Sequence, residues 1–395
     1  MPWTPLLEGT LADEAAQAAR DIVLAVASQP ARDATSADRT VFWAYASHAF
    51  DEPFANACYD AALDDLVTEL RAGVPYPALH GGLAGLGWAL GHVIDGDAEH
   101  ALAVIDEALV ALLSVEHWRG PSDLISGLVG YGVYFLERLA HAPDAAVARD
   151  GLERVVAHLA QRATRSDAGA SWLSPCELLP AHYHAEWPDG HYDCGLAHGV
   201  PGVIAFLDRA ARLADPPAGA RALCDDAVRW LLAQRATDGF PAMVYPGRPR
   251  ARARTAWCYG DPGVAVALWH AAPALARELA LAAVTRDPAT CGVKDSGLCH
   301  GSIGLAHLCN RFYQARSSGD RTLPSAARTW FAYALATRRP EGIAGFPAWR
   351  GDTDSYQPIQ NLLEGAMGVA LALLAAIGHD EPCWDRLLLC DLGGP

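Results

Sequence analysis

Two short strings in this chain contain residue types that bind catalytic metals. They are Trp257-Cys258-Tyr259-Gly260 and Cys299-His300-Gly301. Two thiols and one imidazole make three ligands, the number found in a catalytic zinc site that keeps one position open. Neither string contains a CxxC signature, so spacing alone also allows small core cysteines and a hydrogen-bonded histidine. Residues so far apart form one site only if the fold brings both strings to the same place.

A Gly-x-x-Gly element recurs six times, and about ten mostly apolar residues follow each copy. Runs that are apolar nearly all round predict buried helices. Glycine suits the N-terminal end of such a helix, where the backbone needs a positive φ or a close approach. Six copies in one chain indicate an internal repeat. The runs begin at Gly82, Gly127, Gly199, Gly260, Gly301 and Gly365.

Amphipathic patterns alternate with these runs, and each predicts a half-exposed helix. They cover residues 100–113, 146–163, 219–234, 273–286, 324–337 and 384–391. Residues 11–28 and 55–72 predict a seventh pair without the glycines. We therefore expect one all-α domain over residues 1–395, an α/α toroid of about 14 helices with seven inside and seven outside. Its inner ring would gather every Gly-x-x-Gly loop at one end, around a central cavity.

Two stretches have no helical period. Residues 164–195 contain Pro, Gly, Trp and Tyr, which predicts an insertion with short strands. Residues 241–255 are rich in arginine and lead directly into the Cys258 string. In an acidic protein this second stretch is a candidate loop for contacting a peptide or an anion, and a solvated loop is the alternative.

Composition narrows the class of protein. The chain has 395 residues, of which 51% are hydrophobic and 19% charged, as in soluble globular proteins. A net charge of −16 argues against nucleic-acid binding and suits a basic or neutral peptide partner, or solubility alone. The chain lacks both an 18-residue apolar run and a secretory signal, and its ten cysteines are scattered. We expect a cytoplasmic protein with free thiols.

The paired motifs resemble those of a known family. WCYGDPG and CHGSIG, in a chain of Gly-x-x-Gly helices, resemble the lanthionine synthetase C-like family, the LanC cyclases of lanthipeptide (lantibiotic) biosynthesis. The similarity covers about residues 70 to 380 and includes the alternation of helices. It implies that Cys258, Cys299 and His300 bind a catalytic zinc ion.

The same resemblance implies further residues around the metal. The family's aspartate before the second glycine repeat corresponds to Asp123, and its histidine before a Gly-x-x-Gly element to His198. Its arginine four residues before the first zinc cysteine corresponds to Arg254, and the tyrosine after that cysteine to Tyr259. The family's LLEG motif is present at residues 362–365.

Family members close thioether rings by adding a cysteine thiol of a precursor peptide to dehydroalanine or dehydrobutyrine. Metal coordination deprotonates a thiol, and the enolate formed by the addition needs charge stabilisation and a proton. Histidine has a pKa suited to that duty near neutrality. We assign His198 as the acid or enolate stabiliser, Asp123 as the residue that orients it, and Arg254 and Tyr259 as support.

The implied partners are a dehydrated precursor peptide, made of leader and core, and a separate dehydratase, since the chain has no dehydratase-sized N-terminal region. An export transporter, and with it peripheral association with a membrane, is left open. Two other functions are also left open. One is a LanC-like protein that binds glutathione or serves as an adaptor without cyclase activity. The other is a thiol-alkylating zinc toroid of the prenyltransferase kind, although the two motifs are not its pattern.

Overall fold

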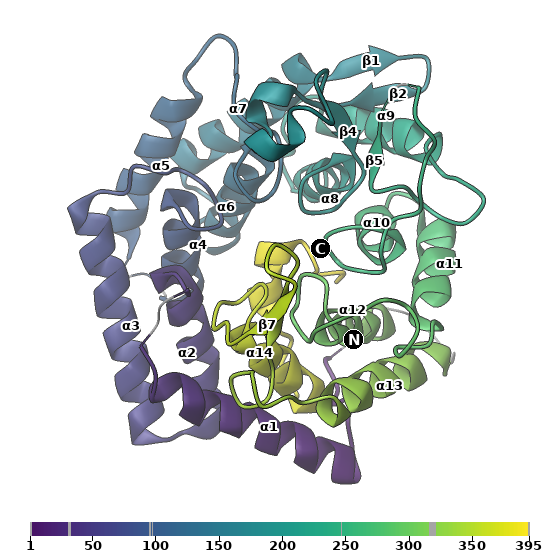
Figure 1. Ribbon diagram of the computed structural model, residues 1–395. Coiled ribbons are helices and arrows are strands. Elements are labelled where there is room, and N and C mark those ends of the chain that lie inside the picture. Colours follow the sequence, from purple (N-terminus) through teal and green to yellow (C-terminus); the bar gives the residue numbers. More distant parts are fainter. Residues whose placement is uncertain are drawn as a thin grey trace.

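Fourteen α-helices form two concentric rings in the part of the chain that the structure describes (Figure 1). The computed structural model describes residues 2–30, 33–94, 96, 98–245, 247–315 and 321–393. The inner ring consists of α2 (Ser36–Phe50), α4 (Leu83–Val93), α6 (Leu128–His141), α8 (Val200–Ala210), α10 (Asp261–Leu268), α12 (Ser302–Gln314) and α14 (Ala366–Ile377). The outer ring consists of α1 (Gly9–Ala27), α3 (Pro53–Ala72), α5 (Glu99–Leu113), α7 (Ala146–Arg162), α9 (Ala220–Leu232), α11 (Pro273–Val284) and α13 (Thr322–Ala336). The predicted α/α toroid of seven inner and seven outer helices is confirmed.

The burial of the helices follows their apolar patterns. Every residue of α10 is buried, whereas α9 buries one face and exposes the other. The first glycine of each Gly-x-x-Gly element directly precedes an inner helix. The second glycine leaves room for the preceding loop: a Cβ at Gly263 or Gly304 would collide with the carbonyl oxygen of Trp257 or Leu298. Among the described helices, none is both long enough and apolar enough to cross a membrane.

The seventh pair differs from the prediction. The stretches 11–28 and 55–72 are helical, but α1 packs outside α14 and α3 packs outside α2. The inner place between α14 and α4 belongs to α2, which the sequence patterns did not identify. Because α2 lacks a Gly-x-x-Gly element, its one local signal is the capping box in which Thr35 and Asp38 bond each other's backbone N–H. The ring closes where the Leu6 N–H donates to the Ala376 carbonyl oxygen, at 2.8 Å.

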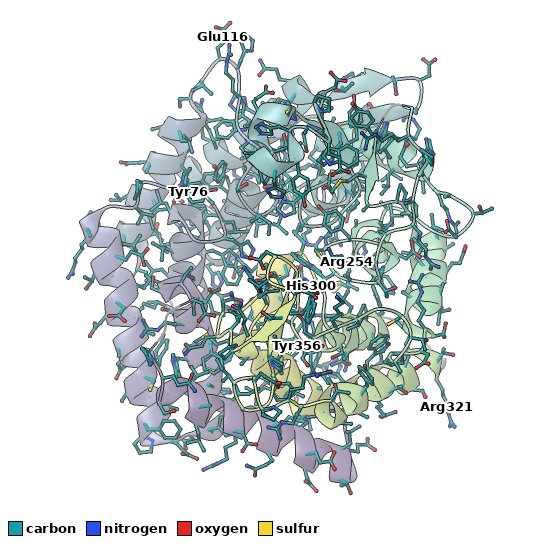
Figure 2. The ribbon with its side chains drawn as sticks, in the orientation of Figure 1. Tyr76, Glu116, Arg254, His300, Arg321 and Tyr356 are labelled. Atoms are coloured by element: carbon teal, nitrogen blue, oxygen red, sulfur yellow. The ribbon has the colours of Figure 1, made fainter. Side chains whose placement is uncertain are left out.

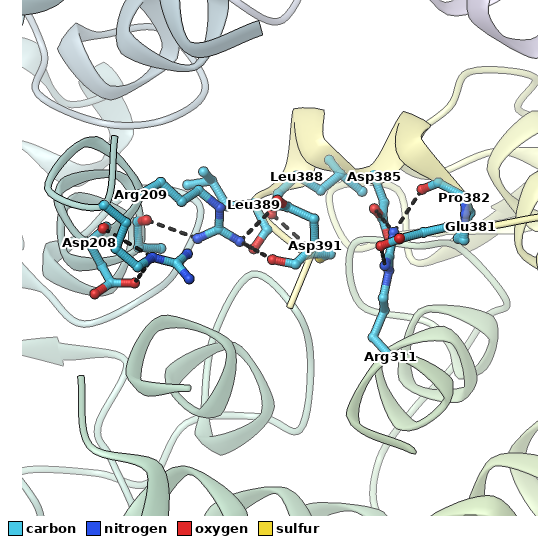
Figure 3. A network of polar contacts seen from close by, with 12 residues as sticks. Asp208, Arg209, Arg311, Glu381, Pro382, Asp385, Leu388, Leu389 and Asp391 are labelled. Atoms are coloured by element: carbon cyan, nitrogen blue, oxygen red, sulfur yellow. Dashed lines mark hydrogen bonds and ion pairs between the residues drawn. The ribbon is translucent and has the colours of Figure 1, made fainter. Parts of the chain in front are cut away.

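The predicted amphipathic helix over 384–391 is wrong. A short 3-10 helix, Cys383–Leu388, forms there instead, and Asp385 within it is completely buried. Asp385 accepts a hydrogen bond from His307 of α12. Asp385 also accepts from Arg311 of α12, and Asp391 accepts from Arg209 of α8 (Figure 3). The charges that suggested a solvated face are therefore paired inside the ring.

Short strands lie in connections that lead from an outer helix to the next inner helix. They are β1 (Thr164–Ser166), β2 (Gly169–Ser171), β3 (Leu173–Ser174), β4 (His191–Asp193), β5 (Met243–Val244), β6 (Ala348–Arg350) and β7 (Ser355–Gln357). β1 and β2 form a hairpin against α9, and β3, β4 and β5 form an antiparallel sheet. β5 comes from the 241–255 stretch, so both irregular stretches share one sheet. β6 and β7 form a separate hairpin.

The loops before the inner helices are joined to one another by backbone hydrogen bonds. In four of these loops, the residue two positions before the first repeat glycine donates to its counterpart in the next loop: His80 to Ile125, Ala197 to Cys258, Cys258 to Cys299, and Cys299 to Leu363. The donor–acceptor distances are 3.0, 3.5, 3.2 and 2.8 Å, respectively. The Leu124 N–H extends the series by donating to the Ala197 carbonyl oxygen at 3.2 Å. Loops that are distant in sequence are thus fixed around one end of the ring.

Candidate active site

Cys258, Cys299 and His300 meet at this loop end, as predicted for a metal site. One potential ligand atom from each residue lies within 4.8 Å of the other two. Cys258 precedes α10, while Cys299 and His300 precede α12, so the backbone bond between the two loops aligns the three side chains. Two sulfurs and one imidazole nitrogen at this spacing suit a tetrahedral zinc ion with one open position. The residues present therefore fit the metal.

The hydrogen bonds within this group favour a negative charge on Cys258 and a positive charge on His300. The hydrogen bond from Cys299, followed by that from His300, lowers the pKa of the Cys258 thiol to about 5. The same bond to Cys258 raises the pKa of the Cys299 thiol. A hydrogen bond with Asp295, together with one to Cys258, raises the pKa of His300 to about 10. A metal would displace the protons that these groups share, as metals do when they bind thiols and imidazoles.

Asp295 supports the metal group from behind. Its Oδ2 lies 3.5 Å from His300 Nε2 and also accepts a hydrogen bond of 2.8 Å from the Trp349 backbone N–H. Its Oδ1 accepts from the Gly297 N–H at 3.3 Å, and its side chain is 1% exposed. A carboxylate behind a histidine ligand fixes the orientation of the ring and raises its basicity. Asp295 is thus a second-layer residue of this site that the sequence reasoning missed.

His198 and Asp123 form the second half of the site. His198 Nδ1 donates to Asp123 Oδ2 at 2.9 Å, across 75 residues of sequence. Burial lowers the pKa of His198, but the hydrogen bond to Asp123 and its charge outweigh burial, so the net pKa lies above 6.5. Asp123 is itself held by the Ser126 backbone N–H, which donates to Oδ1 at 2.8 Å. The pair leaves His198 Nε2 available for a substrate.

Tyr259 lies beside this pair with its hydroxyl already engaged. The hydroxyl donates to Asp193 Oδ2 at 2.7 Å. Burial, followed by the charge of Asp193 and this hydrogen bond, raises the pKa of Tyr259 far above its usual value. Asp193 also accepts from the Gly195 N–H at 2.7 Å, so its carboxylate is fixed in place. Tyr259 therefore stays protonated and cannot act as a base at neutral pH.

Arg254 is the exposed cation of the site. Figure 2 places it close to His300, near the middle of the ring. Two other arginines of the 241–255 stretch have internal contacts: Arg248 stacks on Trp187, and Arg252 lies 3.5 Å from the Asp261 carboxylate. Among the described residues, Arg254 has no carboxylate partner. Contact with an anion thus stays a prediction for Arg254.

Two of the cavities that border the loop ring contain these residues. One of about 380 Å³ contains His198, Asp123 and Tyr259, and the irregular 164–195 stretch supplies an aromatic wall that includes Trp172 and Trp187. The other, of about 520 Å³, borders Arg254 and His300. The backbone bond from Ala197 to Cys258 joins the loop that carries His198 to the loop that carries Cys258. The geometry can thus present a thiol and a proton donor to one peptide.

The missed residues share a weak sequence signal. Asp193 and Asp295 both begin an Asp-x-Gly turn, six residues before the first glycine of a repeat element. Arg254 occupies the same position in its own repeat. The Asp-x-Gly pattern is common in turns, and its recurrence at one position of the repeat is the signal that could have identified both residues.

Another group with metal-ligand chemistry lies within the ring, on α4 and α6. Ligand atoms of His92, Glu137 and His141 lie within 4.8 Å of one another. His92 Nδ1 already donates to Glu137 at 2.7 Å, and its Nε2 lies 2.9 Å from the Tyr45 hydroxyl. Arg386 lies 3.8 Å from the same carboxylate oxygen of Glu137. These contacts satisfy both nitrogens of His92 and the charge of Glu137 without a metal, so we interpret this group as structural.

Comparisons with known proteins agree with this architecture. A solved structure named "Nisin cyclase" matches with a TM-score of 0.73 over 95% of this chain and 97% of that chain, at 17% sequence identity. At that identity the similarity shows a shared fold. The family described as lanthionine synthetase C-like protein matches residues 40–389, a range that contains both cysteine motifs, Asp123 and His198. The chain therefore belongs to the lanthionine synthetase C-like family.

Proposed function

We propose that this protein is a zinc-dependent lanthipeptide cyclase that forms lanthionine and methyllanthionine rings. The observation that carries the proposal is the placement of two chemical groups on adjoining loops. A thiol–thiol–imidazole group suited to zinc lies on the loops before α10 and α12. A charge-stabilised histidine lies on the loop before α8, bonded through Ala197 to Cys258. Membership of the family and the fold shared with the structure named nisin cyclase support the same reaction.

Cys258, Cys299 and His300 are the residues that would hold the metal, with Asp295 orienting His300. When bound, zinc supplies a deprotonated substrate thiol at neutral pH. The N-termini of α10 and α12 lie at these loops, and their partial positive charges favour thiolates there.

The reaction adds S–H across a carbon–carbon double bond. The peptide sulfur bonds to the β-carbon of dehydroalanine or dehydrobutyrine, and the π electrons move to the carbonyl oxygen as an enolate. His198, protonated because Asp123 raises its pKa, donates a hydrogen bond to the enolate and then a proton to the α-carbon. The thiol proton that was lost restores the acid, so the peptide mass does not change.

Tyr259 and Arg254 assist without exchanging protons. The Tyr259–Asp193 hydrogen bond forms a fixed wall of the His198 cavity, so the side chain positions the peptide. Arg254 adds positive charge near the developing anion. We further propose that the substrate is a dehydrated precursor peptide delivered by a separate dehydratase in the cytoplasm. Docking to an export transporter at a membrane is an extension of this proposal.

The test is cyclisation of a dehydrated model peptide that contains one dehydroalanine and one cysteine. Thiol alkylation followed by mass spectrometry counts the cysteines that have not reacted, and fragmentation maps the ring. We expect fast, regioselective ring closure with the zinc-loaded protein. Protein from which a chelator has removed the zinc should show only the slow background reaction. Equal rates for the two forms would contradict the proposal. Binding of glutathione without any ring closure would favour the adaptor alternative.

A further inference from the structure

The cavity beside His300 carries positive charge that the protein does not neutralise. Its lining includes Arg254, Lys294 and Arg350 together with the carboxylates of Asp352 and Glu364. Both carboxylates lie next to Arg350, since Glu364 Oε2 is 2.7 Å from Nη1 and Asp352 Oδ1 is 3.9 Å from Nε. Among the described residues, no carboxylate pairs with Lys294 or Arg254. In a chain of net charge −16, two unpaired cations in one cavity are a local exception.

Lys294 is held in position, although its charge is not paired. Its Nζ lies 4.0 Å from the centroid of the Trp349 ring, a distance at which the ring face attracts a cation. The hydroxyl of Tyr356 on β7 donates to the Lys294 carbonyl oxygen at 2.9 Å (Tyr356 is labelled in Figure 2). The Trp349 N–H is bonded to Asp295, the residue behind His300. The cation and the metal group are therefore built on one connected frame.

We propose that Lys294 and Arg254 form a subsite for a carboxylate of the peptide substrate, next to the cysteine that closes the ring. This inference rests on the proposed function. A peptide whose thiol is at the metal group has its neighbouring residues within reach of the adjoining cavity, whose volume of about 520 Å³ exceeds that of one side chain. A carboxylate is the anion that an ordinary peptide carries, as an Asp or Glu side chain or as its terminus. Lys294 and Arg254 lack a carboxylate partner among the described residues, so each gains a charge-assisted hydrogen bond when the carboxylate binds.

Matched peptides test this subsite. In one pair, Asp or Asn follows the cysteine directly, and in a second pair Asp or Asn precedes it. We expect the wild-type KM to be about 3- to 10-fold lower for an Asp peptide than for its Asn partner, between the effects of an exposed ion pair and a charge-assisted hydrogen bond. Lys294→Met should remove most of that difference, and Lys294→Arg should keep it. For the Asn peptides, both Lys294 variants should have the same kcat as the wild-type protein.

A charge control excludes a general electrostatic effect. Arg277 is exposed on α11 and does not line the cavity, so Arg277→Met removes one positive charge without altering the subsite. This variant should keep the Asp/Asn difference. The inference is overturned if wild type does not distinguish Asp from Asn in either pair. It is also overturned if Lys294→Met slows all peptides equally, since Lys294 would then only balance thiolate charge. Failure of wild type to close any ring would instead contradict the proposed function.

Discussion

The indole nitrogen of Trp257 donates a hydrogen bond of 3.1 Å to the carbonyl oxygen of Leu388. Trp257 directly precedes Cys258, a proposed zinc ligand, and Leu388 ends the 3-10 helix Cys383–Leu388 inside the ring. Asp385 of that helix is bonded to Arg311 (Figure 3). A chain of contacts therefore runs from α12 through this helix to the loop of Cys258. The buried C-terminal segment therefore serves as a support for the metal loop.

This contact predicts a coupled effect of Trp257→Phe. Loss of the N–H leaves the Leu388 carbonyl short of its partner, which should lower the free energy of unfolding by about 1–3 kcal/mol. Because the Cys258 loop loses its support, zinc affinity should fall as well. Trp3→Phe is the matched control, since Trp3 is buried and its Nε1 donates to the carbonyl oxygen of Ala375, which lies in the last turn of α14, at the opposite end of that helix from its loop. Thermal unfolding and chelator competition should show that both variants lose stability and that only Trp257→Phe loses zinc affinity.

The metal group predicts about one zinc ion per chain. Cys258→Ala, Cys299→Ala and His300→Ala should each lower the zinc content measured by mass spectrometry of the purified protein. Cys224→Ala removes a buried thiol of the outer helix α9 and should retain zinc. Full zinc content in all three site variants would disprove the assignment.

Asp295→Asn should weaken zinc binding without abolishing folding. The amide keeps the shape of the side chain but loses the charge that orients and polarises His300, a change that typically costs 10- to 100-fold in metal affinity. Competition with a fluorescent chelator measures the change directly. Asp352→Asn, an exposed carboxylate of the neighbouring cavity, is the control and should bind zinc like the wild type.

His198→Ala should slow ring closure by about 10²- to 10⁴-fold and leave the zinc content unchanged, because in the proposed mechanism the residue donates protons and is not a ligand. Uncatalysed addition of thiols also forms rings, so the assay must follow the ring pattern as well as the count of free cysteines. His100→Ala, on the exposed face of α5, is the control. A wild-type rate and ring pattern in His198→Ala would remove this residue from the mechanism.

The pH dependence of Asp123→Asn has a defined sign. The proposed mechanism requires the proton on His198, so the rate should fall as pH rises through the pKa of this residue. Asp123 holds that pKa above 6.5 through a hydrogen bond and its charge, against the opposing effect of burial. Removing the charge should lower the pKa and move the alkaline limb of the kcat profile to lower pH. An unchanged limb would mean that another group supplies the proton.

Much of the ring could be predicted because its inner helices carry two signals at once. Each of six runs, such as the one that becomes α10, is apolar all round and directly follows a repeated glycine pair. The helix α2 carries neither signal. Its inner position depends on α14 and α4, whose contacts with it are absent from any local pattern. The prediction of an amphipathic helix over residues 384–391 was wrong for a related reason. Asp385 has the sequence pattern of a solvated residue, and only the fold places Arg311 beside it.

Some residues of the candidate site could likewise be predicted from the sequence, and others could not. The metal residues are recognisable because their motifs are specific, and their predicted convergence followed from the expected ring. Asp295 and Asp193 act through single hydrogen bonds to His300 and Tyr259, and only three-dimensional proximity reveals such contacts. Arg254 and Lys294 each look like ordinary surface charge until the cavity between them is seen.

Closure of the ring determines how the site can unfold. In an open solenoid each terminal repeat has one neighbour, so it frays first. Here α14 lies against both α1 and α2, and Trp269 at the end of α10 stacks on Phe312 of α12 with ring centroids 5.2 Å apart. No repeat is left at a free end, and separating any one of them disrupts two interfaces together. The metal loops should therefore share the cooperative stability of the whole ring, and their amide hydrogens should exchange on the timescale of global opening.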